Sequence, residues 1–340
     1  IYLVMKLKNA NWLIKKKEGL YCIPGDFYID PLYPVEKALI THAHTDHARP
    51  NNHSILGTKE TIEIMKIRYA KSYCNNYQVV NYNSPLTINN IVITFIPAGH
   101  ILGSSQILIE YNGYKVLISG DYKRVEDKTC KGYQNKKCDT FVTEATFGLP
   151  IFSHPSDKDE IKKLLESVNK NRQKPHLIGV YALGKCQRIL SLLRDAGYDD
   201  TIYLHGALVK ITDYYISQGI DIGKVKNTSD LNLSELKNQI ILCPPSAIHD
   251  KWSRKFKNPI KGIVSGWMNI RQRIKQKNIQ LPLIISDHAD WNDILLTTKE
   301  NNPDKVLVTH GREEALVFQL NKLGFEAKAL NLLGYEDEYE

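Results

Sequence analysis

The chain has 340 residues, a formal net charge of +8 and a mean hydropathy of -0.34. It contains no apolar run near the roughly 18 residues of a membrane-spanning helix and no apolar core of a secretory signal, so we expect a cytoplasmic protein without a membrane partner. The six cysteines form no CxxC pair, which argues against a zinc ribbon and agrees with reduced thiols. The length is sufficient for two domains.

From about residue 20 to residue 145, short β-type runs alternate with turns, and Thr58–Tyr73 has the pattern of a helix. Within this stretch the run THAHTDHA, residues 41–48, follows a short apolar strand-like segment. Its imidazole and carboxylate groups suit a borderline divalent cation such as zinc. His42 and His44 can converge on one ion, whereas Asp46 and His47 face another direction and can serve a second. A structural zinc site would normally use cysteine, so this pattern favours a catalytic metal centre.

Single polar residues follow several later apolar runs, at the expected ends of strands. Loops that project from strand ends lie on a rigid scaffold, and sites are commonly built there. We therefore expect these residues to join the histidine-rich run in one site. They are His100 after 91–96, Asp121 after 115–118, His288 after 283–285 and His310 after 306–308.

The pattern changes to alternating strands and helices between about residues 155 and 270. Ser156 and Asp159 predict the start of a helix that continues through Asn169. The other expected elements are strands at 176–180, 202–204, 240–243 and 263–265 and helices at 187–194 and 207–218. After about residue 280 the strand-then-histidine pattern returns, with helices near 291–300 and 313–323, the first capped by Asp290. Because site candidates lie on both sides of the middle block, we predict one domain inserted into another.

The ordered set of Asp30, the HxHxDH run, His100 and Asp121 resembles the motifs of the metallo-β-lactamase fold. Further matches resemble the β-CASP nucleases: Glu144 looks like motif A, His288 like motif B and His310 like motif C. The strings YALGKCQ at 181–187 and SGWM at 265–268 are similar to that family as well. The opening, residues 19–49, resembles most the bacterial ligase-associated DNA exonucleases.

This resemblance implies an α/β fold, a metallo-β-lactamase αββα sandwich with an inserted α/β β-CASP domain. The sandwich would comprise residues 1–150 and a return segment at 279–340, and the inserted domain residues 151–278. The implied cofactors are two divalent metal ions, with zinc favoured over manganese.

The resemblance also implies a role for each site residue. One metal would be held by His42, His44 and His100, the other by Asp46, His47 and His310, with Asp121 bridging them. Asp46, Glu144 and His288 are the residues implied for the reaction itself, His288 as general acid and Glu144 as the group that orients it. Asp30 is expected to orient His42 or His44 from behind.

The middle block contains a tract rich in basic and aromatic residues between Lys251 and Lys277. Basic side chains can follow phosphates while aromatic rings stack on bases, as in single-strand binders. A lysine-rich solvated surface would have the same composition. The candidate nucleic-acid contacts are Arg254, Lys255, Trp267, Arg271 and Arg273. Lys185, between a strand and a helix, is a further candidate for holding a phosphate, although a simple turn is nearly as consistent with the pattern.

Four functions compete at this level. The first is a two-metal DNA exonuclease in DNA repair, acting from the 5′ end of single-stranded or end-containing DNA, with an ATP-dependent DNA ligase and a helicase as functional partners. The second is an RNA-processing nuclease of the same superfamily, which His310 favours because RNA-directed members usually carry histidine there. The third, a small-molecule hydrolase, would not need the middle block. The fourth, a non-catalytic scaffold, would have lost metal ligands, and here every one is present.

Overall fold

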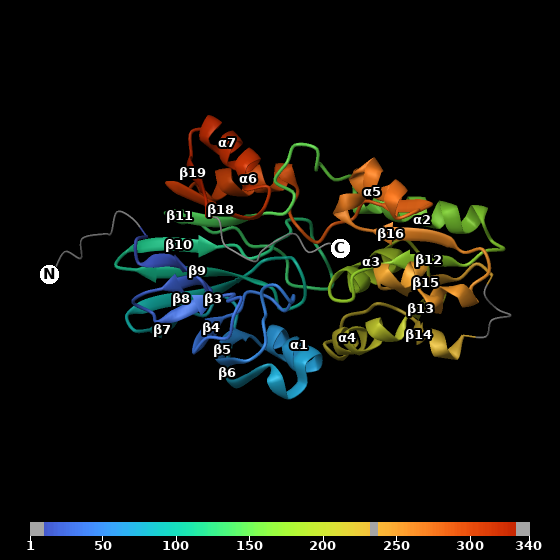
Figure 1. Cartoon of the computed structure of the whole chain (residues 1–340), viewed down its shortest axis with the longest axis horizontal. Coiled ribbons are helices and arrows are strands. Elements are labelled where there is room, and N and C mark those ends of the chain that lie inside the picture. Colours follow the sequence, from blue (N-terminus) through green and yellow to red (C-terminus); the bar gives the residue numbers. More distant parts are fainter. Residues whose placement is uncertain (1–9, 232–236, 331–340) are drawn as a thin grey trace. The chain divides into compact units, whose positions relative to one another are not determined.

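The computed structural model describes residues 10–231 and 237–330 (Figure 1). These residues form two compact units. Unit 1 contains the described residues up to Ile151 and those from His288 onward, and unit 2 contains Phe152–Asp287. The first division falls one residue after the expected boundary at 150, and the second falls at 287 rather than 278. No helix in the described ranges combines the length and apolar character needed to cross a membrane.

Unit 1 contains two β-sheets. The first has the order β1-β2-β3-β4-β5-β6: β1 (Leu13–Lys16), β2 (Gly19–Cys22), β3 (Phe27–Ile29), β4 (Lys37–Leu39), β5 (Asn52–Thr58) and β6 (Cys74–Val80). The second has the order β19-β18-β11-β10-β9-β8-β7: β7 (Leu86–Ile88), β8 (Ile91–Pro97), β9 (Ser105–Tyr111), β10 (Tyr114–Ile118), β11 (Thr140–Ala145), β18 (Lys305–Gly311) and β19 (Glu326–Ala329). The pairing of β18 with β11 is parallel, with Val306 opposite Phe141.

Alternate side chains of the second sheet enter two different cores, as the two-residue period of a strand requires. In β9, Ile107 and Ile109 pack with first-sheet residues such as Leu39, whereas Leu108 packs with helix residues such as Leu316. The helices are α1 (Lys59–Tyr69), continued by η1 (Ala70–Ser72), α6 (Trp291–Asn301) and α7 (Glu313–Lys322). Helix α1 lies against β5 and β6, and α6 and α7 lie against the second sheet (Figure 1). This is the predicted αββα sandwich.

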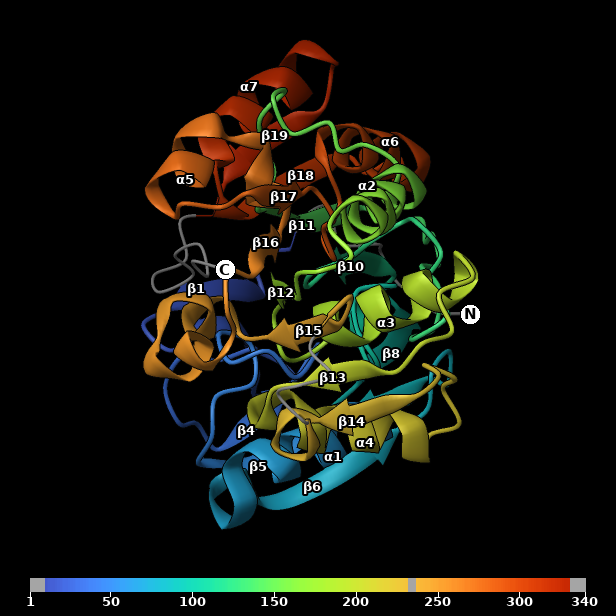
Figure 2. The ribbon, with the colours of Figure 1, turned by 90° about the vertical axis from the view of Figure 1, so that its right-hand side faces the viewer.

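Unit 2 is built on one parallel sheet with the order β14-β13-β15-β12-β16-β17 (Figure 2). Its strands are β12 (His176–Gly179), β13 (Ile202–Leu204), β14 (Val225–Asn227), β15 (Ile240–Cys243), β16 (Ile260–Val264) and β17 (Leu281–Leu283). Its helices are α2 (Asp157–Lys170), α3 (Lys185–Asp195), α4 (Gly206–Ser217) and α5 (Arg271–Gln276), with short 3-10 segments η2 (Thr228–Asp230), η4 (Pro245–His249), η5 (Lys251–Lys255) and η6 (Gly266–Asn269).

The two faces of this sheet are covered differently. Side chains of α2 and α3, such as Leu164 and Ile189, pack on Ile178 and Leu242 in the larger core. The opposite face is covered by η4, η6 and α5, and Figure 2 shows α5 on the other side of the sheet from α2 and α3. Coverage on both faces explains why a central strand such as β15 is continuously apolar in the sequence.

Local sequence signals place several element ends correctly. Ser156 caps α2 by accepting from Lys158 N, and Asp290 caps α6 by accepting from Asp293 N at 2.9 Å. The strand expected at 283–285 lies earlier in the chain, because β17 ends at Leu283. There, Ile284 N donates to the buried Glu160 Oε2 at 2.8 Å instead of to a neighbouring strand. Residues 284–287 therefore form the connection that leads to His288.

Candidate metal centre

The HxHxDH run forms a loop immediately after β4 in unit 1. Ile40 N still donates to Leu56 O at 2.9 Å, so the sheet continues to the residue before the loop. The loop then turns back on itself, since Ala48 N donates to His44 O at 2.8 Å. A tight turn of this kind brings side chains that are close in sequence toward one point, and His42 and His44 are buried there.

Asp30 holds this loop from behind. Its left-handed backbone, with φ +43°, follows β3. Its carboxylate accepts from Thr41 N at 2.8 Å, from Thr41 Oγ1 at 2.5 Å and from His47 Nδ1 at 2.8 Å. We expected Asp30 to orient His42 or His44 from behind. The residue held directly is His47, and His42 is reached through Thr41, whose Oγ1 lies 3.0 Å from His42 Nδ1.

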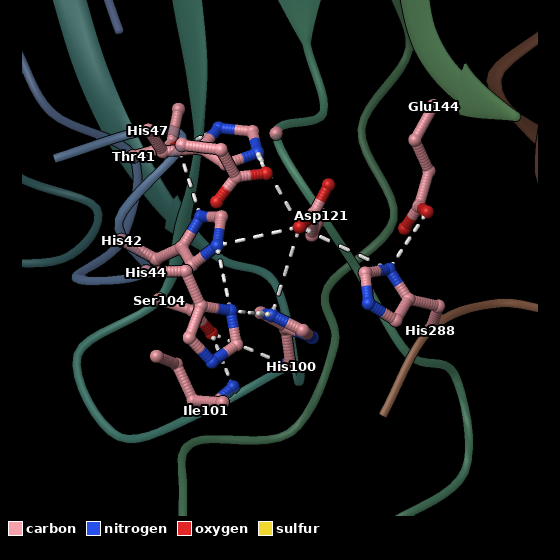
Figure 3. Close-up of polar contacts among 12 residues, drawn as sticks. Thr41, His42, His44, His47, His100, Ile101, Ser104, Asp121, Glu144 and His288 are labelled. Carbon is pink, nitrogen blue, oxygen red and sulfur yellow. Dashed lines mark hydrogen bonds and ion pairs between the residues drawn. The ribbon is translucent and has the colours of Figure 1, made fainter. Parts of the chain in front are cut away.

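Two further loops deliver His100 and Asp121. The loop after β8 is fixed by Ser104 Oγ, which accepts from the backbone N–H of His100 at 3.1 Å (Figure 3). Gly120, which precedes Asp121, has φ +52°, and a Cβ there would lie 2.8 Å from Thr41 Oγ1. Only glycine combines this conformation with this approach. The Asp121 loop can therefore lie directly against the histidine loop.

His310 comes from the return segment, at the end of β18. Its φ of +56° is uncommon for a residue with a side chain and coincides with an irregularity in the pairing of β11 with β18. Its ring stacks on that of His47, with centroids 4.6 Å apart and planes at 9°. Burial lowers the pKa of His310 to about 4, so its ring is neutral at pH 7. A neutral imidazole is the form that binds a metal ion.

Histidine side chains from two loops converge on one oxygen of a third loop, Asp121 Oδ2. It lies 3.3 Å from His42 Nε2, 3.4 Å from His47 Nε2 and 3.8 Å from His100 Nε2 (Figure 3). The first clustered group is His42, His44, His100 and Asp121, the second is Asp46, His47 and His310, and the third is Asp121, Glu144 and His288, with potential ligand atoms within 4.8 Å of one another in each group. The first two correspond to the two ligand sets that the sequence predicts, with Asp121 beside both.

The donor set fits divalent cations. Asp46 Oδ1 and Asp121 Oδ1 are buried and have no hydrogen-bond partner within the ranges the structure describes. Buried carboxylate oxygens normally have a partner, and a metal ion would supply one. Three imidazoles with a carboxylate, and two imidazoles with a carboxylate, are ligand sets that zinc accepts. The geometry thus supports two adjacent cations.

The histidines and carboxylates of the cluster shift one another's pKa values. Burial lowers the pKa of His42 well below its usual value, and the neighbouring His47 adds to this effect. Although burial opposes protonation of His47, the carboxylates of Asp121 and Asp46 raise its pKa well above the usual value. Against the effect of burial, His47 and His288 hold the pKa of Asp121 well below the usual range. In the absence of a cation, a proton on His47 therefore balances part of the acidic charge.

A second functional group, the pair of Glu144 and His288, lies beside Asp121. His288 Nδ1 is 2.9 Å from Glu144 Oε2 and 3.9 Å from Asp121 Oδ2 (Figure 3). Glu144 Oε1 accepts from Tyr122 N at 2.8 Å, and Ala289 N donates to Tyr122 O at 2.6 Å. Burial raises the pKa of Glu144, with a further contribution from Asp121. The backbone N–H and C=O of one residue, Tyr122, thus brace both the carboxylate and the segment carrying His288.

Two of the candidate nucleic-acid contacts of unit 2 are buried inside it. Lys185 is fully buried, with Nζ 3.3 Å from Asp287 Oδ2 and 3.3 Å from Ile285 O. Trp267 is only 4% exposed and packs edge-on against Phe152 at a centroid distance of 5.0 Å. Neither side chain is placed to meet a phosphate or a base, because each is occupied inside unit 2. We therefore leave both out of the proposed contacts.

The remaining four candidates lie on elements that cover one face of the unit 2 sheet. Arg254 and Lys255 belong to η5, and Arg271 and Arg273 belong to α5. Trp252 of η5 and Ile274 of α5 pack against the same small core, which fixes both segments to that face. The guanidinium of Arg273 lies over the Trp267 ring at 4.1 Å.

Sequence reasoning missed two supporting residues. Thr41 links Asp30 to His42, and its position directly before the HxHxDH run was the available signal. Arg68 of α1 donates to Ala43 O at 2.6 Å and to Thr45 Oγ1, both inside the histidine loop. Nothing in the sequence marks Arg68, because its contacts lie more than 20 residues away.

Comparison with known proteins identifies nucleases and a probable DNA ligase among the relatives. No protein-family model matches the chain. It is 26% identical over 323 residues to a probable DNA ligase of Opitutus terrae, an alignment that covers 94% of this chain and 31% of that protein. It is 26% identical over 353 residues to an RNase J-like protein of Methanocaldococcus jannaschii, covering 84% of each. Over 144 residues it is 38% identical to endoribonuclease ysh1 of Emericella nidulans, covering 41% of this chain and 16% of that protein.

Among solved structures, a protein of unknown function from Enterococcus faecalis has a TM-score of 0.55 with this chain at 12% identity. The match covers 81% of this chain and 75% of that one, and it supports the fold alone.

Proposed function

We propose that this chain, a member of the β-CASP family of metallo-β-lactamase-fold nucleases, is a two-metal DNA exonuclease. The observation that carries the proposal is the position of Asp121. Its Oδ2 lies within 3.4 Å of a nitrogen from each histidine group and 3.9 Å from His288 Nδ1, so one carboxylate joins both groups to a candidate acid. A hydrolase for phosphodiesters needs these parts together.

When bound, the two ions would activate water and neutralise charge on the phosphate. The groups His42, His44, His100 and Asp46, His47, His310 would hold them, with Asp121 shared. His288 supplies a proton to the leaving oxygen from Nε2, because Nδ1 is bound to Glu144. Glu144 keeps the imidazole in one orientation and favours its protonated form. Tyr122 N fixes the second oxygen of Glu144, so the carboxylate cannot rotate away.

DNA as substrate is supported by the extent of one match. The alignment with the probable DNA ligase covers 94% of this chain, whereas that with ysh1 covers 41%. We therefore propose action from the 5′ end of single-stranded DNA in repair, together with an ATP-dependent ligase. Arg254, Lys255, Arg271 and Arg273 are the proposed phosphate contacts.

RNA is the second candidate substrate. The RNase J-like relative covers 84% of this chain, and both it and ysh1 are named for action on RNA. His310 at motif C favours the same alternative. The chemistry proposed for the metals and His288 is identical for both polymers.

The test is cleavage of matched DNA and RNA strands, labelled at the 5′ or the 3′ end, with zinc, manganese or magnesium. We expect DNA to be shortened from the 5′ end. His288→Ala should retain its metals but lose roughly 10²–10⁴-fold in turnover. His53→Ala, which changes an exposed histidine of unit 1 outside the cluster, is the matched control. Faster cleavage of RNA would replace DNA as the substrate, and no cleavage of either by the metal-loaded protein would refute the nuclease function.

A further inference from the structure

The histidine loop is held from two sides. On the inner side, Asp30 fixes Thr41 and His47, as described above. His42 is thereby fixed as well, through Thr41. The other two ligand candidates of the loop are His44 and Asp46.

Arg68, near the C-terminal end of α1, occupies the outer side. Its Nη1 donates to Ala43 O at 2.6 Å, and its Nη2 donates to Thr45 Oγ1. Ala43 O belongs to the peptide that leads into His44, and Thr45 lies between His44 and Asp46. A guanidinium presents two parallel donors in a rigid fork, which fixes orientation as well as distance. Both acceptors come from the loop and not from the carbonyls of α1, so Arg68 is not a cap of its own helix.

The other end of α1 is tied to the loop that carries His100. Thr58 Oγ1 and Thr61 Oγ1 both donate to Gly103 O, at 2.7 and 2.9 Å. Gly103 has φ +85°, and a Cβ there would lie 2.6 Å from Thr61 N, so the contact requires glycine. Between these ends, α1 buries Ile62 and Met65, which keep it fixed on the sheet.

We infer that α1 is a brace between the two ligand loops and that Arg68 is the residue that positions His44 and Asp46. Each proposed ion takes one of these ligands, His44 for the first and Asp46 for the second. Loss of Arg68 should therefore weaken the binding of both ions, whereas loss of Asp30 should weaken mainly the binding of the ion held by His47. The inference rests on the proposed metal centre, but it does not require a nucleic-acid substrate.

The experiment measures zinc affinity by competition with a coloured chelator, and thermal unfolding of the metal-free protein. The variants are Arg68→Met, Arg68→Lys and Thr45→Val. The matched control is Lys66→Met on the same helix, since Lys66 pairs with Glu63 at 2.7 Å and not with the loop.

We expect Arg68→Met to lower both zinc affinities by roughly 10–100-fold, the usual effect of losing a group that orients ligands. Arg68→Lys should recover little, because an ammonium cannot replace the fork. Thr45→Val should give a smaller loss, and the double variant of Arg68→Met with Thr45→Val should equal Arg68→Met alone. Lys66→Met should bind zinc like the wild type.

Three results would overturn the inference: wild-type affinity in Arg68→Met, additive losses in the double variant, or a loss confined to one ion. If Arg68→Met does not fold without metal, Thr45→Val decides, since it removes only a hydroxyl. A wild-type protein that binds no zinc would instead contradict the proposed function.

Discussion

The substitution Asp30→Asn tests how the second proposed metal site is prepared. Asp30 is 4% exposed, and its three hydrogen bonds run to Thr41 N, Thr41 Oγ1 and His47 Nδ1 at 2.8, 2.5 and 2.8 Å. In the asparagine variant, Oδ1 can still accept from Thr41 N. The amide that replaces Oδ2 is a donor, so it turns His47 Nδ1 into an acceptor and places the ring proton on Nε2. That atom faces Asp121 at 3.4 Å and Asp46 at 3.5 Å, which is where the ion would bind.

A metal ion at Nε2 would displace a proton in the wild type too, but there the ring keeps its Nδ1 proton on Asp30. In the variant the ring would have to move its proton to Nδ1, against the amide donor. We expect zinc at the site of Asp46, His47 and His310 to bind roughly 10–100-fold more weakly, or about 1.4–2.7 kcal/mol, as for other groups that orient a ligand histidine. The ion at the first site should change by no more than about threefold, well below that second-site loss. Competition with a coloured chelator resolves the two affinities.

The matched control is Asp127→Asn. Asp127 is 8% exposed and accepts from Thr129 N and Thr129 Oγ1, both at 2.8 Å, so like Asp30 it is a buried carboxylate that holds a threonine, but it belongs to none of the candidate ligand groups. The Asp127→Asn variant should bind zinc as the wild type does. Equal loss in the control, or a loss at the first site larger than at the second, would refute the tautomer argument.

Further outcomes follow from other parts of the molecule. Asp121→Ala should empty both metal positions or nearly so, because it removes the shared carboxylate, and elemental analysis that still finds two ions would contradict this. Replacing Arg271 and Arg273 by alanine should flatten the salt dependence of single-stranded DNA binding by about one unit per lost contact, and equal slopes would show that these side chains are only solvated. Burial in unit 2 lowers the pKa of His176 to about 4, below that of the unfolded chain, so its contribution to stability is present above about pH 6.5 and is lost as the pH falls toward 4. Between pH 7 and pH 5 the wild type should lose about 2 kcal/mol more than His176→Gln in urea unfolding, and parallel loss in both proteins would refute this assignment.

The sequence indicated which residues cluster better than it indicated which residues hold them in place. The HxHxDH run and the strand-end residues could be assigned because ligand types and strand ends are local signals. The partner of Asp30 could not, because the choice between His42 and His47 depends on how the loop turns after Thr41. The burial of Lys185 could not be predicted for a similar reason, because only the fold shows Asp287 beside it.

The ends of helices and strands could likewise be predicted only where local residues mark them. Helices α6 and α7 and strands β13 and β15 were expected within a residue or two, since capping residues and apolar runs mark their ends. The strand before His288 was predicted to end two residues too late. The buried Glu160 accepts a hydrogen bond from Ile284 N, which ends the strand there. That contact joins residues 124 positions apart, so the local sequence does not reveal it.

The parallel pairing of β18 with β11 also sets the order in which this molecule can be completed during synthesis. Strand β11 ends at Ala145, but its neighbour begins at Lys305, so that edge must wait until the whole intervening segment has left the ribosome. Unit 2 is continuous in the chain and can form meanwhile, as domains generally fold as units. His310 arrives last, and with it the third ligand candidate of the second group. A nascent chain shorter than this would hold the first group of ligand candidates complete and the second incomplete, so the candidate metal centre stays unfinished until β18 has been synthesised.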